Sequence, residues 1–283
     1  MKKTHFIRSL SYTIIIVLAI SACSNDKSFG LLRKTIEKEI EMGDYKNALT
    51  RIENHLKENK LNDDFKILKA KVLNGIGEHE DAVKLLTTVS KKNDTIYYLI
   101  SENYFHIANL SDDDNQYFKA IKNIDKSLTQ NPQNLNSYIL KAKILHNLDK
   151  KKEAMTVIIN GLKISPQNSK LICYRGIERL SLGDLRGSEL DFDQSLNSKD
   201  LDSTDISYIF RFKAVNRYND NLEVKIKNLN KAISYSPKNA INYELRADLY
   251  FIKGDTASAC EDYSKAIELG NMSVFEKVKE TCK

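Results

Sequence analysis

Residues 138–166 read YILKAKILHNLDKKKEAMTVIINGLKISP, and this stretch decides the fold. The small residues Ala142 and Ala154 and several bulky apolar residues recur at helical spacing on either side of Asp149. Asp is a residue type that tolerates positive φ, and the stretch ends at Pro166. The pattern therefore predicts two short helices that are joined by a tight turn and packed closely through their small residues.

The same pattern recurs along the chain at a nearly constant interval. Pro132 and Pro166 are 34 residues apart, and Pro166 and Pro237 are 71 residues apart, close to twice that interval. A 34-residue period with small, bulky and turn residues in this register resembles the tetratricopeptide repeat, a helix–turn–helix unit. The resemblance implies an all-α fold, a right-handed superhelical solenoid of stacked helix pairs.

About seven such repeats cover residues 31–271. In six of them the turn between the two helices falls on a residue type that tolerates positive φ: Gly43, Gly77, Asp149, Gly183, Asn219 and Gly254. A four-helix bundle would need longer helices, and an α/α toroid would not give the 34-residue register, so both are weaker interpretations.

The third repeat is predicted to contain a stretched loop with the acidic run Asp112 to Asn115. A calcium loop would need a Gly turn and a distal Glu that are missing at the right spacing. We therefore expect these acids to be solvated and to cap a helix, although an inserted loop is also a common place for function.

Residues 1–22 have the organisation of a signal peptide. Basic residues precede an apolar run from Tyr12 to Ile20, which is too short to cross a membrane. The run leads into Ile20-Ser21-Ala22-Cys23, which resembles the lipobox of bacterial lipoproteins. The resemblance implies that Cys23 is lipidated and that residues 23–30 form a lipidated N-terminus and tether. An ordinary signal peptide that ends beside a cysteine is the alternative.

The residue after Cys23 bears on localisation. In lipoproteins of two-membrane bacteria, Asp at this position resembles an inner-membrane retention signal, and here the position is Ser24. We expect the protein to be lipid-anchored in the cell envelope, at the periplasmic face of the outer membrane where the host has one.

Charge and motifs exclude several functions. The formal charge is +6, but loss of residues 1–22 removes Lys2, Lys3 and Arg8 and leaves +3, so we expect no nucleic-acid partner. None of the five His has metal-ligand spacing. The run from Glu78 to Asp81 is expected to complement a helix dipole. With no phosphate loop or nucleophile motif, we expect no metal, cofactor, small-molecule substrate or catalytic residue.

The resemblance implies a concave groove that is lined by the first helix of each pair. The family's groove positions carried onto this chain are Lys71, Asn74, Lys143, His146, Lys213, Arg217, Glu244, Asp248 and Phe251. Lys71, Lys143 and Lys213 occupy equivalent positions, which favours a basic stripe that accepts an acidic or extended peptide. Three solvated lysines of a Lys-rich protein are the alternative. The lysine and asparagine set of the chaperone-binding carboxylate clamp is not found in order.

Three cysteines follow Cys23, in a chain that is expected to be exported and so to permit disulfides. Residues 272–283 are predicted to form a capping helix with a Ser273/Glu276 capping box. Phe275, Val278 and Cys282 fall on one face of that helix. We predict a Cys260–Cys282 disulfide that holds the cap, with Cys173 free. Two independent buried thiols are the alternative.

Together these features predict a membrane-anchored, non-catalytic scaffold or adaptor that binds protein or peptide partners in the bacterial cell envelope. The alternative function is a chaperone-like periplasmic module that binds extended secretion clients. One stoichiometric partner would indicate the scaffold, and weak binding of many extended peptides would indicate the chaperone.

Overall fold

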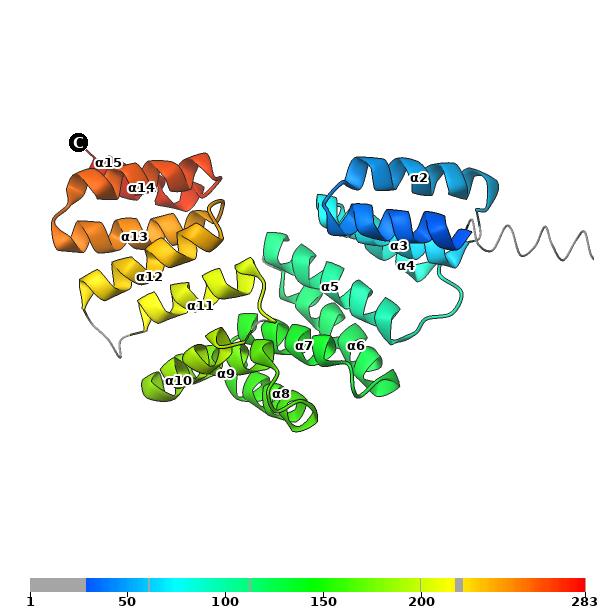
Figure 1. The fold of residues 1–283 in the computed structure, drawn as a ribbon, viewed down its shortest axis with the longest axis horizontal. Helices are drawn as coiled ribbons and strands as arrows, with labels where there is room; N and C mark the ends of the chain where they lie inside the picture. The colour runs from blue at the N-terminus through cyan, green and yellow to red at the C-terminus, as the bar shows by residue number, and fades with distance from the viewer. Residues whose placement is uncertain (1–28, 61, 112, 199, 217–220, 283) are drawn as a thin grey trace, which may run out of the picture. The chain divides into compact units, whose positions relative to one another are not determined.

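Antiparallel helix pairs follow one another along the chain (Figure 1). The computed structural model describes residues 29–60, 62–111, 113–198, 200–216 and 221–282, and within these ranges it contains helices and no strand. The chain divides into two compact units, Met1–Asn131 and Pro132–Lys283. The expected all-α architecture of repeated helix pairs is confirmed.

The first unit contains a helix over residues 29–41, followed by α2 (Tyr45–Glu58), α3 (Asp63–Ile76), α4 (His79–Thr87), α5 (Asp94–Ser111) and α6 (Asp114–Gln130). The second unit contains α7 (Leu135–Asn147), α8 (Lys151–Ile164), α9 (Ser169–Ser181), α10 (Leu185–Leu196), α11 (Ser203–Val215), α12 (Leu222–Tyr235), α13 (Ala240–Lys253), α14 (Thr256–Glu268), η1 (Met272–Val274) and α15 (Phe275–Thr281).

The turns within the pairs have the backbone conformation that the sequence predicts. Five of the six predicted turn residues have positive φ, and Asp149, at φ 57°, is the one non-glycine among them. The sixth, Asn219, lies outside the described residues. The residue after the turn then caps the second helix in several pairs: Asp44, Asp184 and Asp255 each accept a hydrogen bond from a backbone N–H of the first turn.

The cores lie between helices rather than at one centre. One cluster joins α7, α8 and α9 through residues such as Ala142, Ile158 and Leu171, and another joins α9, α10 and α11 through Ile177, Phe192 and Ile209. Since each cluster draws on two successive pairs, no pair buries its apolar face alone.

Buried hydroxyl groups connect helices within the pairs and, at one point, between two pairs. Ser207 of α11 donates to the carbonyl of Ala232 on α12 at 2.7 Å, and Asn242 of α13 donates to the Ser207 hydroxyl at 3.0 Å. Ser195 donates in the same way to the carbonyl of Ser169 at 2.7 Å. These bonds satisfy polar groups inside the stack, where an unpaired group would be unfavourable.

The prediction of a stretched loop in the third repeat is wrong. The extra residues extend α5, which runs for 18 residues to Ser111, while α6 already begins at Asp114. No Gly or Pro interrupts this part of the sequence, so the helix continues. Asp113 caps α6 by accepting from the backbone N–H of Asn115, as expected, and Asp112 lies outside the described residues.

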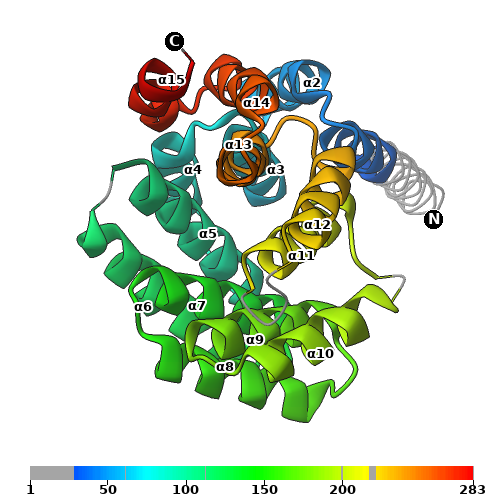
Figure 2. The same cartoon turned by 90° about the vertical axis from the view of Figure 1, so that its left-hand side faces the viewer.

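A short cap ends the second unit. α15 lies beside α14 (Figure 2), and η1 packs on α14 as well. Val274 is fully buried against the last pair, and Val278 packs on the same cluster. The prediction of a Ser273/Glu276 capping box is wrong. The Ser273 hydroxyl donates to Asn271, and α15 begins at Phe275 with no side-chain cap. The preceding 3₁₀ turn changes which residues face inward, so Val274 is buried and Phe275 is 45% exposed.

Among the described residues, no helix has both the length and the apolar character needed to cross a membrane.

Candidate functional site

Cations lie over aromatic rings on the first helices of three successive pairs in the second unit. Lys143 Nζ on α7 lies 5.2 Å from the centre of the Tyr174 ring on α9. On α11, Arg211 Cζ lies 4.2 Å from the centre of the Tyr208 ring and 5.6 Å from that of Phe212. Since α9 packs against both α7 and α11, these groups lie on neighbouring helices. We call Lys143, Tyr174, Tyr208 and Arg211 the cation–aromatic row.

The row is half-buried rather than fully exposed. Burial raises the pKa of Tyr174 well above its ordinary value, and nearby Cys173 and Tyr208 raise it further. The phenol therefore stays neutral at physiological pH. Each exposed cation–aromatic contact contributes roughly 0.5–1 kcal/mol, and more when water is excluded.

A buried carboxylate lies between the same helices. The Glu178 side chain of α9 is 1% exposed, and its Oε1 lies 2.7 Å from Nδ1 of His146 on α7. Its Oε2 has no hydrogen-bond partner among the described residues. Because a buried, unpaired carboxylate is unfavourable, this contact ties α7 to α9. His146, predicted to line the groove, therefore also takes part in packing between pairs.

Two pairs contain an Arg–Asp bridge between their first and second helices. Arg175 Nε and Nη2 on α9 donate to the two carboxylate oxygens of Asp191 on α10, at 3.0 and 2.6 Å. Arg246 on α13 donates in the same way to Asp262 on α14, at 2.7 Å for both bonds. These hydrogen bonds raise the pKa of both guanidinium groups. Such bidentate bonds fix one helix against the other.

The pair α11–α12 has the arginine without the acid. With one extra residue in the connection, Arg211 aligns with Arg175 and Arg246, and Asn228 stands where they have Asp191 and Asp262. Each of these second-helix residues lies four positions before a fully buried small residue: Ser195, Ala232 and Ala266. No carboxylate among the described residues forms an ion pair with Arg211, and burial lowers the pKa of its guanidinium.

The predicted basic stripe is not continuous. Lys213 forms ion pairs with Glu189 and with Asp193 on α10, the latter at 2.6 Å, and its side chain is only 12% exposed. Burial alone would lower the pKa of Lys213, but the hydrogen bonds to Asp193 and Glu189 raise it above its ordinary value. Two acids of the preceding pair therefore neutralise Lys213, and it does not present an open charge to a peptide.

Two acidic residues of the predicted groove bind the chain's own cap. Lys277 Nζ of α15 donates to Glu244 Oε1 at 3.0 Å and to both oxygens of Asp248, at 2.9 and 3.0 Å. Asn271 donates to Glu244 at 2.8 Å, and the Tyr263 hydroxyl donates to Asp248 at 2.5 Å. This part of the predicted groove is occupied by the chain itself.

The remaining groove residues have separate surroundings. Phe251 of α13 is 52% exposed. Lys71 and Asn74 lie on α3 of the first unit, where Lys71 is half-buried and the Asn74 amide donates to Glu102 Oε2 at 2.9 Å. Arg217 and the lipidation candidate Cys23 lie outside the described residues.

Cys260 on α14 and Cys282 at the end of α15 form a disulfide in the structure, with Cα atoms 5.6 Å apart and a sequence separation of 22. This is the pairing expected from the sequence, and it joins the end of α15 to α14. Cys173 is free and buried, and burial raises the pKa of its thiol, so it has little thiolate character.

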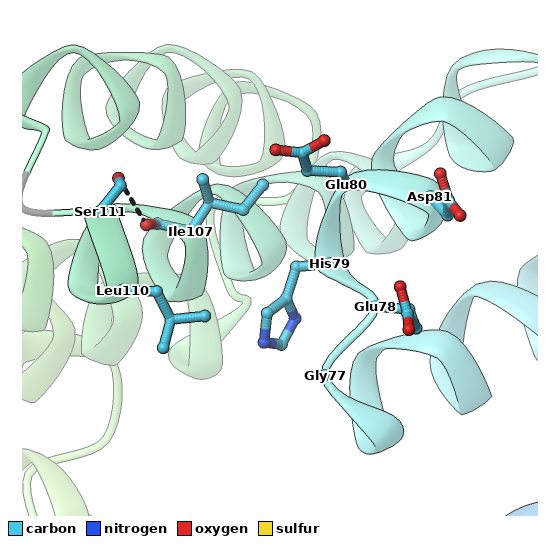
Figure 3. Close-up of a pocket in the computed structure, with 8 residues that line it drawn as sticks. All are labelled: Gly77, Glu78, His79, Glu80, Asp81, Ile107, Leu110 and Ser111. Carbon is cyan, nitrogen blue, oxygen red and sulfur yellow. Dashed lines mark hydrogen bonds between the residues drawn. The ribbon is translucent and has the colours of Figure 1, made fainter.

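A surface pocket of about 420 Å³ lies in the first unit, between the start of α4 and the end of α5 (Figure 3). His79 Nδ1 is 3.2 Å from Asn103 Oδ1, and the His79 ring stacks on that of His106 with centres 4.7 Å apart. Glu80 and Asp81 lie in the first turn of α4, where acids favour the helix dipole, as predicted. No cluster of potential metal ligands occurs among the described residues.

Comparison with known proteins identifies the repeat. The family model described as "Tetratricopeptide repeat" matches residues 135–168 and 240–269, which correspond to α7–α8 and α13–α14. No curated protein matches the chain.

Solved structures match over most of the chain. A tetratricopeptide repeat protein from Parabacteroides merdae ATCC 43184 is 17% identical, with a TM-score of 0.69 over 91% of this chain and 100% of its own. A thermophilic TPR protein of Thermus thermophilus is 15% identical, with a TM-score of 0.54 over 71% and 97%. The human IFIT1 dimer with PPP-AAAA is 14% identical, with a TM-score of 0.55 over 83% and 63%. These likenesses establish the fold.

The Arg211 site was missed at the sequence level, although a signal for it was present. Arg175, Arg211 and Arg246 are in register, and the acid that follows the first and the last is replaced by Asn228. Glu178 carried no such signal, because its burial depends on packing between α7 and α9.

The matched repeats and the similar solved structures show that the helix pairs form a tetratricopeptide repeat solenoid, a fold whose members are generally non-catalytic modules for protein interaction.

Proposed function

We propose that the protein is a non-catalytic scaffold or adaptor of the bacterial cell envelope, which binds protein partners and is held to the membrane by a lipid on Cys23. The fold supports the binding part of this proposal, because stacked helix pairs present an extended surface to a partner. The lipobox-like sequence that ends at Cys23 supports the anchor.

The observation that carries the proposal is the cation–aromatic row. Stacked Tyr rings are rigid and expose both an apolar face and a polar edge, and Arg and Tyr dominate the binding energy at many protein interfaces. The row crosses three first helices, so one extended segment of a partner can contact several pairs at once. Glu178 and the acids near Lys213 give the surroundings a mixed charge, which favours a specific protein over a polyanion.

Partner capture tests the binding function. The native lipoprotein should be crosslinked mildly in cells, purified and analysed for stoichiometric partners, beside Lys143→Glu in the row and Lys163→Glu on the exposed surface of α8 as a matched control. We expect one partner, lost several-fold from Lys143→Glu and retained by Lys163→Glu. Weak capture of many extended chains by all three proteins would instead indicate the chaperone-like function.

The anchor needs its own test. Cys23→Ser should abolish incorporation of a clickable fatty acid and should leave the protein unprocessed by the lipoprotein signal peptidase. Equal labelling of the parent and the variant would refute the anchor, and it would leave the binding proposal intact.

A further inference from the structure

The three aligned arginines of the second unit provide an internal comparison. In α9–α10 and α13–α14 the guanidinium binds both oxygens of a carboxylate at 2.6 to 3.0 Å. In α11–α12 the corresponding position is Asn228, an amide that carries no charge. Where the second helix of a pair supplies a carboxylate, the arginine at this position therefore binds it.

Arg211 is held ready for such a group. The Tyr208 ring supports its guanidinium at 4.2 Å, and Phe212 flanks it at 5.6 Å. Burial lowers the pKa of this guanidinium, whereas the carboxylates raise those of Arg175 and Arg246. The Tyr208 side chain also forms a hydrogen bond with the guanidinium, which partly offsets the effect of burial on the pKa. A phenol carries no charge, however, and its one oxygen uses only part of the five N–H donors of the guanidinium.

We propose that Arg211, supported by Tyr208 and Phe212, is a binding site for the carboxylate of an Asp or Glu side chain in an acidic segment of a partner protein. This inference rests on the proposed protein-binding function and names the chemistry that the partner must supply. The partner's carboxylate would take the part that Asp191 and Asp262 play in the neighbouring pairs.

The surroundings favour a carboxylate over a phosphate. The charges of Asp202 and Asp205 act on Tyr174 and raise its pKa, and Lys170 pairs with both acids at 3.2 and 2.8 Å. A dianionic phosphate would be repelled by these acids more strongly than a singly charged carboxylate. The flat guanidinium also matches the two oxygens of a carboxylate.

A defined probe tests the site. Fluorescein-labelled (Glu-Ala)₄ peptide should bind the purified mature chain in an anisotropy titration at low salt, and the (Gln-Ala)₄ peptide should not. A hydrogen bond to a charged group is worth about 1.5–3 kcal/mol, so Arg211→Gln should weaken binding roughly 10- to 100-fold. Asn228→Asp should weaken it similarly, because an internal carboxylate then occupies the arginine.

Matched variants separate this effect from net charge and from folding. Asn160→Asp on the exposed surface of α8 makes the same change in charge away from the site and should leave binding unchanged. Asn228→Asp is expected to be at least as stable as the parent, so it tests the site even where Arg211→Gln folds poorly. Equal binding by the parent and Asn228→Asp would overturn the proposal. So would tighter binding of a phosphoserine peptide, or no binding of (Glu-Ala)₄ by the parent.

The outcome is distinguishable from failure of the proposed function. A parent protein that captures a stoichiometric partner in cells, with unchanged capture by Asn228→Asp, would preserve the scaffold and eliminate the Arg211 site. Absence of any partner for the parent would eliminate the scaffold itself.

Discussion

The pairs α9–α10 and α11–α12 share a fold and a register but differ in how they satisfy one arginine. In α9–α10, Asp191 is 3% exposed and receives hydrogen bonds from both Arg175 and Arg179. In α11–α12 the aligned Arg211 has a tyrosine ring in place of a carboxylate. A repeat therefore specifies backbone and core closely, while its polar contacts remain free to differ from pair to pair.

The difference also suggests where function resides in a regular solenoid. In a pair whose arginine already binds a carboxylate of the same pair, few hydrogen-bond donors remain for a ligand. In a pair whose half-buried arginine has no such carboxylate, donors remain that a ligand can bind. Lys213 and Asp248, both expected to face a ligand, are instead satisfied by neighbouring elements, because α10 and α15 supply their partners.

The largest expected effect comes from breaking the complete pair. Asp191→Ala leaves Arg175 and Arg179 beside a cavity without their carboxylate, and removal of one member of a buried ion pair is destabilising by about 3 kcal/mol or more. Urea unfolding followed by circular dichroism measures the change. Asp193→Ala on the same helix, whose side chain is 60% exposed and pairs with Lys213, should change stability by less than about 1 kcal/mol, because Glu189 still pairs with that lysine. Equal effects of the two variants would contradict the account of Asp191.

The last pair differs from the others because the cap is joined to it covalently. Cys260→Ser with Cys282→Ser opens a loop that spans 22 residues, which in the chain-entropy model lowers stability by about 3 kcal/mol. Urea unfolding should detect this loss, and reduction of the parent with dithiothreitol should reproduce it. Cys173→Ala serves as the control for thiol loss without loss of the crosslink. Free alkylation of both Cys260 and Cys282 in oxidised protein would rule out the bond.

Asn228→Asp should make α11–α12 resemble its neighbours. The new carboxylate can accept from Arg211, and such a half-buried pair should raise the free energy of unfolding by about 1 kcal/mol. Double substitution with Arg211→Gln measures the coupling between the two positions. A coupling energy near zero would show that the aspartate does not reach the arginine and that the two pairs differ in more than one residue.

The smallest effect concerns a carboxylate of the first unit that is fully satisfied. Asp63 accepts from the hydroxyl and the backbone N–H of Ser90 and from Lys66, and these bonds lower its pKa to about 2. The folded pKa lies below the unfolded value of about 4. The contribution of Asp63 to the free energy of unfolding is therefore fully present above about pH 4, and it is lost as the pH falls from about 4 to about 2.

Ser90→Ala should move the Asp63 midpoint upward, toward 4, and should flatten the acid limb of the stability curve in that window. An NMR titration of the Asp63 side-chain carbon measures the midpoint directly. Thr87→Ala, which removes a hydroxyl bonded to the Lys84 carbonyl, should leave the midpoint in place. An unchanged midpoint in Ser90→Ala would show that the Ser90 hydroxyl is not the main cause of the lowered Asp63 pKa.

The fold could be predicted because several independent signals agree in register. Turn residues such as Gly183 and Asp149 fall where positive φ is needed, and Ala142 and Ala154 fall where helices meet. The predictions that failed concern the ends of helices. The extension of α5 and the 3₁₀ turn before Phe275 each depend on small differences in the free energy of starting or ending a helix, and the periodicity of the sequence does not resolve these differences.

The site was predicted less well for a related reason. A sequence position on a first helix indicates a face, but it does not indicate whether a neighbouring pair supplies a partner. Lys213 meets Glu189 and Asp193 from α10, and Glu244 meets Lys277 from α15, and these contacts arise only from stacking. Arg211 differs because the missing acid is visible in the sequence once the repeats are aligned.

The hydrogen-bond chain from Asn242 through Ser207 to the Ala232 carbonyl has a mechanical consequence. It runs through α11, α12 and α13, so one buried bond joins the helices of the pair α11–α12 and a second joins that pair to α13. A force that separates α13–α14 from α11–α12 must break the second bond, which shares the Ser207 hydroxyl with the first. In an optical-trap experiment these pairs should therefore extend in a single step of double length. Ser207→Ala should split that step into two smaller ones.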